Sequence, residues 1–151
     1  MNSDRRRTAP VAGAVLFASA VFAAGGCWSG PPTTDYSKAG LVQVAGTVRL
    51  GGNPLAKAIV IFENPENGTF SFARTDSTGR YTLRFDSVQP GVTKGRKVVR
   101  IKTTGSLGED DRDASAGPER VPACYNSTSK LSVEVTAAST STDFDLDPNC
   151  G

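Results

Sequence analysis

From Leu41 onward, apolar and polar residues alternate with a period of two in one short segment after another. In residues 41–50, for example, Val42, Val44, Val48 and Leu50 share one parity. This period is typical of a strand with one buried face, and no segment keeps the period of a helix. Glycine, proline, asparagine and aspartate punctuate the segments as turn signals. The pattern predicts a seven-stranded antiparallel β-sandwich, an all-β fold, over residues 41–151.

The alternation also predicts which side chains point into the core. In residues 55–62 both faces are apolar, so we expect this strand to be covered on both sides. In residues 70–75, Phe70 and Phe72 share a face, which we interpret as the core face. The further residues expected to point inward are Tyr81, Leu83, Phe85, Leu131, Val133, Val135, Phe144 and Leu146. Asp76 and Gly79 have the composition of a tight turn between two strands.

A motif pattern runs through residues 45–85. It reads G-x-V, a short turn, G-x-P-L, A-x-V-x-F and T-D-x-x-G-x-Y, at Gly46, Val48, Gly52, Pro54, Leu55, Ala58, Val60, Phe62, Thr75, Asp76, Gly79 and Tyr81. The pattern resembles the carboxypeptidase regulatory-like family, and residues 121–147 are similar to the C-terminal half of small bacterial envelope lipoproteins of that type. The resemblance implies a prealbumin-like (transthyretin-type) sandwich that serves as an accessory module without catalysis. Lys97 departs from it, because the family usually has an aromatic residue there.

Residues 1–26 have the layout of a secretory signal peptide. A basic head at residues 5–7 precedes an apolar run of about 14 residues and then small residues. A membrane-spanning helix needs roughly 18 or more apolar residues, so the run predicts export.

Cys27 follows three small residues, Ala24, Gly25 and Gly26. This arrangement resembles the lipobox of bacterial lipoproteins, although leucine is usual at the position of Ala24. We expect Cys27 to be acylated and residues 27–40 to form a flexible tether. Trp28 is not acidic, which favours the outer membrane or cell surface within the cell envelope. The alternative is ordinary secretion with Cys27 left as a thiol.

The two remaining cysteines, Cys124 and Cys150, flank the last two predicted strands. Disulfides persist in an exported protein, and a hairpin returns its end close to its start. We therefore predict a disulfide between them. The alternative is that Cys124 is a buried apolar residue and Cys150 a loose thiol.

Charge and histidine content exclude several classes of function. The chain has 17 Lys and Arg against 15 Asp and Glu, and without the three Arg and one Asp of residues 1–26 each total is 14. A domain with no net charge and no basic stripe lacks the positively charged surface that binds nucleic acid. The chain has no histidine and no C-x-x-C motif, so the common zinc and copper sites and a cysteine–histidine enzyme are excluded. The transthyretin-related hydrolases also need histidines, so their activity is excluded as well. We expect no cofactor.

The acidic stretch at residues 105–120 resembles a calcium-binding loop in part. Asp111, Asp113 and Ser115 have the alternate spacing of such a loop, but Gly117 falls one position late and Pro122 stands where the closing glutamate belongs. We favour a solvated acidic loop partly paired with Arg112 and Arg120.

Together these features predict a lipid-anchored envelope module that binds or scaffolds and is not an enzyme. Its partners would be the membrane, through the lipid, and an envelope protein or polysaccharide. The alternative is a carbohydrate- or calcium-dependent recognition domain. Four aromatic residues are candidates for a binding surface, and none forms a platform alone: Trp28, Phe70, Phe72 and Tyr125.

Overall fold

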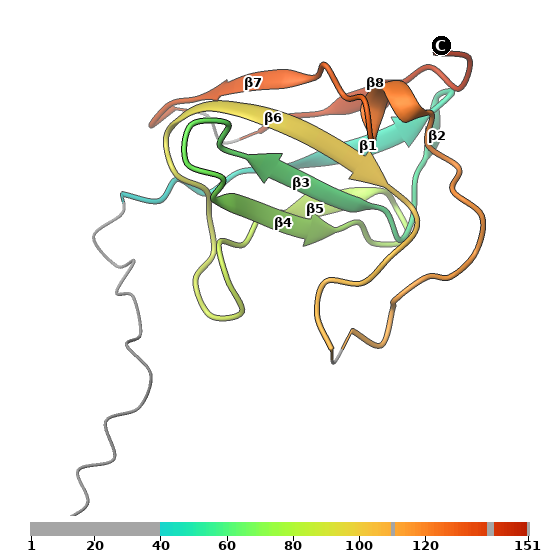
Figure 1. The fold of residues 1–151 in the computed structure, drawn as a ribbon, viewed down its shortest axis with the longest axis horizontal. Coiled ribbons are helices and arrows are strands. Elements are labelled where there is room, and N and C mark those ends of the chain that lie inside the picture. The colour runs from blue at the N-terminus through green and yellow to red at the C-terminus, as the bar shows by residue number, and fades with distance from the viewer. Residues whose placement is uncertain (1–39, 110, 139–140, 151) are drawn as a thin grey trace, which may run out of the picture. The chain divides into compact units, whose positions relative to one another are not determined.

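A computed structural model describes residues 40–109, 111–138 and 141–150 (Figure 1). The predicted signal peptide, Cys27, Trp28 and the tether up to residue 39 lie outside the described residues. The elements in chain order are β1 (Ala45–Leu50), β2 (Asn53–Pro54), β3 (Ile59–Glu63), β4 (Phe70–Arg74), β5 (Arg80–Thr82), β6 (Gly95–Lys102), the 3-10 helix η1 (Ala123–Tyr125), β7 (Ser132–Val135) and β8 (Phe144–Leu146). None of the described residues belongs to a helix long and apolar enough to cross a membrane.

The strands form two sheets. One sheet has the order β4-β3-β6-β7 and is antiparallel throughout. In the other, β1 pairs with β2 and β5 in antiparallel fashion and with β8 in parallel fashion. The prediction of a wholly antiparallel fold was therefore wrong at β8, because alternation indicates which face of a strand is buried but not the direction of the neighbouring strand.

The core lies between the two sheets, which meet through three aromatic rings. Phe62 of β3 lies 6.5 Å from Tyr81 of β5 and 6.1 Å from Phe144 of β8, measured between ring centroids. Most residues predicted to point inward are buried, which confirms the alternation for β1, β5, β7 and β8. The expectation that β3 is covered on both sides holds at Ile59 but not at Ile61, which is only half-buried on the outer face. The largest fully buried side chains include Phe62, Ile59, Leu83, Ile101, Val44, Val48 and Val60.

Strand β4 is turned the opposite way from the prediction. Its buried residues are Ser71 and Ala73, whereas Phe70 is 54% exposed and Phe72 is half-buried. The register explains this, because Phe62 lies opposite Ser71 and Val60 opposite Ala73, and residues that lie opposite each other share a face. Since Val60 and Phe62 fill the core, the small residues of β4 face it and the two phenylalanines face outward.

The turn at Asp76 forms as predicted. One carboxylate oxygen of Asp76 accepts hydrogen bonds from the main-chain N–H of Thr78 at 2.8 Å and of Arg80 at 3.0 Å. Gly79 adopts a φ of +77°, a conformation that L side chains rarely take. The turn sets the start of β5 and so places Tyr81 in the core.

Cys124 and Cys150 form a disulfide with a Cα–Cα distance of 6.2 Å, in agreement with the predicted pairing. Next to it, the hydroxyl of the half-buried Tyr125 accepts a hydrogen bond from the Asp147 N–H at 3.2 Å. The residues after β8 are thus fastened to the segment around η1.

Candidate functional site

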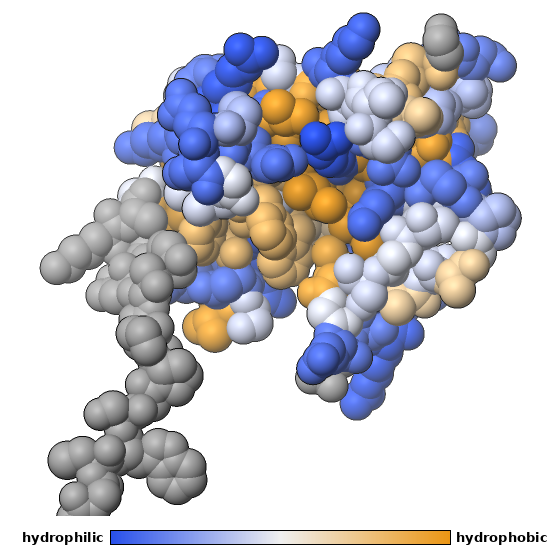
Figure 2. Space-filling model, viewed as in Figure 1, coloured by the Kyte–Doolittle hydropathy of each residue, from blue (hydrophilic) through white to orange (hydrophobic). Residues whose placement is uncertain are grey.

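The outward-facing side of the sheet β4-β3-β6-β7 carries apolar side chains. Phe70 and Phe72 project from it, and their ring centroids lie 6.2 Å apart with the planes tilted by 45°. Ile61 of β3, the neighbour of Phe72 across the strand pair, is only half-buried. Figure 2 looks onto this side and shows apolar surface at its centre, surrounded by hydrophilic side chains.

Two adjoining hollows lie beside this surface and together form what we call the β4 groove. One has a volume of 340 Å³ and the other of 460 Å³, and both are lined by Phe72, Asp86, Ser87 and Leu107. The groove combines apolar with charged side chains: Phe70, Phe72, Phe85 and Leu107 with Arg84, Asp86, Glu109 and Asp111.

One wall of the β4 groove is the hairpin that follows β5. The N–H groups of Phe72 and Arg84 each donate to the carbonyl of the other residue at 2.9 Å, which fastens the hairpin to the edge of β4. Asp86 holds the tip, because one of its carboxylate oxygens accepts from the N–H groups of Gln89 at 2.6 Å and Val88 at 2.7 Å. The bonds from Gln89 and Val88 lower the pKa of Asp86. Its carboxylate is therefore charged at neutral pH.

The other wall is the acidic loop, which Asp111 ties to β4. Asp111 accepts hydrogen bonds from the N–H of Leu107 at 2.7 Å and of Asp113 at 3.1 Å, and it forms an ion pair with Arg74. The hydrogen bond from Leu107 is the main cause that lowers the pKa of Asp111. Partial desolvation acts to raise this pKa, and Arg74 lowers it further. Asp113 pairs with Lys57 at 3.3 Å. The ionic partners of these two aspartates are thus Arg74 and Lys57, and not Arg112 and Arg120 as predicted.

The three calcium candidates do not converge on a common point for a cation. Asp111 and Asp113 each face a cationic side chain, and the main chain of Ser115 pairs with that of Gly105. Within the described ranges, no group of three or more Cys, Asp or Glu side chains is arranged to hold a metal ion.

Glu119 closes the acidic loop at its base. Its carboxylate accepts from the N–H groups of Thr103 at 2.8 Å and Val121 at 2.9 Å, and from the hydroxyls of Thr103 and Thr104. Partial desolvation opposes the charge, but the hydrogen bonds from Val121, Thr103 and Thr104 outweigh it and lower the pKa of Glu119 to about 2. The loop is therefore held at its base by Glu119 and in its middle by Asp111, and both carboxylates accept main-chain hydrogen bonds.

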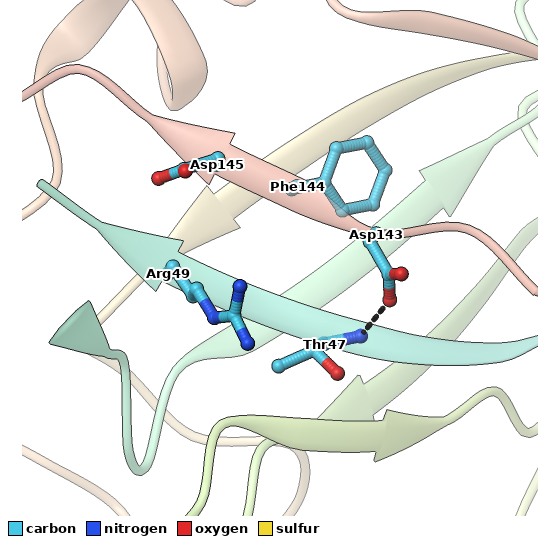
Figure 3. A pocket seen from close by; sticks show the side chains of 5 residues that line it. All are labelled: Thr47, Arg49, Asp143, Phe144 and Asp145. Carbon is cyan, nitrogen blue, oxygen red and sulfur yellow. Dashed lines mark hydrogen bonds between the residues drawn. The ribbon is translucent and has the colours of Figure 1, made fainter. Parts of the chain in front are cut away.

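A smaller polar pocket of 170 Å³ lies on the outer side of the other sheet (Figure 3). Thr47 and Arg49 of β1 line it with Asp143, Phe144 and Asp145 of the β8 segment. The Asp143 carboxylate accepts a hydrogen bond from the Thr47 N–H at 2.7 Å, and that of Asp145 accepts from the Gly52 N–H at 3.3 Å. Both aspartates thus already bond to main-chain N–H groups of β1 and the turn that follows it.

A further pocket of 500 Å³ lies beside the disulfide and is lined by Tyr125, Lys130 and Leu131 among others. Tyr125 is half-buried there, with its hydroxyl bonded to the main chain of Asp147. The aromatic residues considered as a surface are thus separated, with Phe70 and Phe72 in the β4 groove and Tyr125 in this pocket.

Sequence reasoning missed Arg84, Phe85, Asp86 and Leu107 as neighbours of the two phenylalanines. The sequence did contain a signal for the outward orientation of the phenylalanines, because they alternate with the small residues Ser71 and Ala73, which fit opposite the large core residues of β3.

Comparison with protein-family models and with curated proteins finds no match for this chain.

Proposed function

We infer that the protein is a non-catalytic binding module of the cell envelope, which engages its partner through the β4 groove. One observation carries this inference: two large apolar side chains stand on the outer face of β4, with Phe70 54% exposed and Phe72 half-buried. Exposing a large apolar side chain forgoes the free energy that its burial would contribute to folding. Contiguous apolar surface with a polar rim is typical of interaction sites.

We also propose that the two sheets form a prealbumin-like sandwich. The packing of two sheets through Phe62, Tyr81 and Phe144 supports a sandwich of the prealbumin-like, carboxypeptidase regulatory-like type. In the part of the chain that the structure describes, β1 and β3 to β8 lie in segments expected to be strands, which supports this assignment, and β2 is an additional two-residue strand. In such a module the rigid sheets present the loops and the outer faces for binding.

Anchoring through an acylated Cys27 is the second element of the proposal. The basic, apolar and small-residue layout of residues 1–27 supports it. Metabolic labelling with an alkyne fatty acid should mark the wild-type protein, and Cys27→Ser should abolish the mark and release the protein or leave the precursor uncleaved. Wild-type protein without label would contradict the anchor and leave the binding function untouched.

Capture of ligand from envelope extracts tests the binding function. The full-length protein, purified in detergent and immobilised, should retain proteins or polysaccharides, which mass spectrometry and sugar analysis identify. Phe70→Asp places a charge in the groove and should abolish capture. Val88→Asp is the matched control, since Val88 is 81% exposed and does not line the groove. Equal capture by all three proteins would refute a binding role for the groove.

A further inference from the structure

We propose that the ligand of the β4 groove is an uncharged polysaccharide. This inference rests on the proposed binding function and adds the chemical class of the ligand. It depends on three properties of the groove: its aromatic surface, its balance of donors and acceptors, and its shape.

The aromatic surface suits the C–H faces of sugar rings. A sugar ring presents axial C–H groups that carry partial positive charge, and the face of an aromatic ring carries partial negative charge. Phe70 and Phe72 are two residues apart on one face of β4, with centroids 6.2 Å apart. Neighbouring sugars of one chain can therefore each contact one phenylalanine.

The surface is held in place before any ligand arrives. Phe72 lies in a strand paired with β3 on one side, and its own N–H and carbonyl bond to Arg84 on the other. Binding to a preorganised surface loses less conformational entropy than binding to a loop. This matters for sugars, because each contact that a sugar makes is weak.

The charged side chains of the groove suit hydroxyl groups. Asp86 and Glu109 provide acceptors and Arg84 provides donors within the same hollow, and a sugar hydroxyl both donates and accepts. Asp111 is already paired with Arg74, which leaves two carboxylates, Asp86 and Glu109, against the single cation Arg84. The groove therefore carries a net negative charge. An anionic polymer would be repelled by Asp86 and Glu109, which favours an uncharged chain.

The dimensions of the groove fit a polymer better than a protein partner. Each hollow, at 340 and 460 Å³, has a size usual for small-ligand sites, and the two adjoin through shared residues. Consecutive sugars of one chain can occupy both. A stable protein interface needs about 800 Å² from each partner with an apolar centre, which four partly covered apolar side chains do not supply.

Affinity electrophoresis of the purified full-length protein tests the proposal. Native gels would contain dextran, laminarin, galactomannan or hydroxyethyl cellulose, and dextran sulfate or polygalacturonate would serve as anionic comparisons. We expect at least one neutral polymer to retard the protein and the anionic polymers to have no such effect. Phe70→Ala and Phe72→Ala should each weaken the apparent affinity about tenfold, and Val88→Ala should leave it unchanged.

A second variant separates loss of stacking from loss of folding. Phe70→Leu keeps the apolar bulk at an exposed position and removes the aromatic face, so we expect an unchanged melting temperature and weakened retardation. Retardation by no neutral polymer would overturn the polysaccharide proposal. If envelope proteins were then still captured in a Phe70-dependent way, the binding function would stand with a protein as partner. If capture did not depend on Phe70, both proposals would be wrong.

Discussion

The hydroxyl of Tyr81 donates a hydrogen bond of 2.6 Å to the main-chain carbonyl of Thr142. This contact connects β5 to the segment that enters β8, over 61 positions of the chain. The Tyr81 ring also stacks on Phe144, with centroids 6.4 Å apart. Tyr81 therefore fixes the position of β8, the strand that alternation alone would not have placed parallel to β1.

Tyr81→Phe should lower the free energy of unfolding by about 1 kcal/mol, because the carbonyl of the half-buried Thr142 loses its donor while the ring packing stays. Burial, with the nearby Asp143, raises the pKa of the Tyr81 hydroxyl, so the folded protein keeps it protonated. Above a pH of about 10 the hydroxyl ionises in the unfolded chain, and the advantage of tyrosine over phenylalanine should shrink. Urea unfolding at pH 7 and pH 10.5 measures both effects. An unchanged midpoint at pH 7 would contradict the role given to this bond.

Gly46→Ala should destabilise the domain by about 3 kcal/mol or more. A Cβ at position 46 would lie 1.9 Å from the Thr142 carbonyl oxygen, a main-chain atom that cannot move without displacing β8. Gly117→Ala is the matched control, since a Cβ there would meet only the Ser115 hydroxyl at 3.6 Å. Thermal unfolding of both variants checks this, and equal melting temperatures would show that the segment before β8 does not pack against β1 in this way.

Glu119→Gln should remove part of the acid sensitivity of the protein. The folded pKa of about 2 lies below the ordinary value of 4.5, so the stabilisation by Glu119 is complete above pH 4.5 and is lost as the pH falls toward 2. Because Glu119 is largely exposed, we expect the contribution to be about 1–2 kcal/mol. Unfolding free energies between pH 6 and pH 2.5 should fall less steeply for the variant. Parallel curves for variant and wild type would be evidence against a charged clamp at Thr103 and Thr104.

Lys97→Met should raise the stability by about 1 kcal/mol. Lys97 is 1% exposed on the inward face of β6, and its only hydrogen bond within the described residues goes to the Lys94 carbonyl at 3.0 Å. Desolvation lowers the pKa of Lys97, and Glu134 and Glu66 offset this only in part.

As the pH rises toward 10.5, Lys97 therefore loses its proton in the folded chain before it does so in the unfolded chain. The free energy of unfolding of the wild type should rise as the pH approaches 10.5, and that of Lys97→Met should not show this rise. Lys130→Met, at an exposed position, is the control. A Lys97→Met variant less stable than wild type at pH 7 would mean that the buried charge has stabilising partners.

Replacing both Cys124 and Cys150 with alanine should lower the unfolding free energy by about 3.5 kcal/mol, the chain-entropy estimate for a loop of this length. The bridge spans 26 positions and holds the end of the chain beside η1. A reducing agent should destabilise the wild type to a similar extent and leave the double variant unaffected. Two thiols that react with an alkylating reagent before reduction would rule out the bridge.

Periodicity predicted the all-β class and most of the buried residues because a strand exposes alternate side chains to two environments. It predicted Val48, Val60, Leu83 and Leu146 as buried. It failed for β4, where both parities contain plausible core residues. Phe70 and Phe72 are larger and more apolar than Ser71 and Ala73, so the pattern favoured them for the core. In the structure, however, the residue opposite the core residue Phe62 is the small Ser71.

Lys97 and the acidic loop show the same limit. Alternation places Lys97 on the buried parity with Val99 and Ile101, but only the packing of β6 shows that its charged end is covered. The loop partners Arg74 and Lys57 are 37 and 56 positions from Asp111 and Asp113. Charge spacing along the chain points to neighbours such as Arg112, which the folded loop does not use for these two carboxylates.

The sequence by itself determined where strands form, where the chain turns and which cysteines could meet, because each of these depends on the preferences of a few adjacent residues. Tertiary structure alone decided which face of β4 is buried, the parallel pairing of β8 with β1 and the assembly of the β4 groove. These depend on contacts between residues far apart in the chain, such as Phe72 with Arg84 and Tyr81 with Thr142. The close packing of the core determines which side chains fit inside it, and the pattern of adjacent residues does not contain this information.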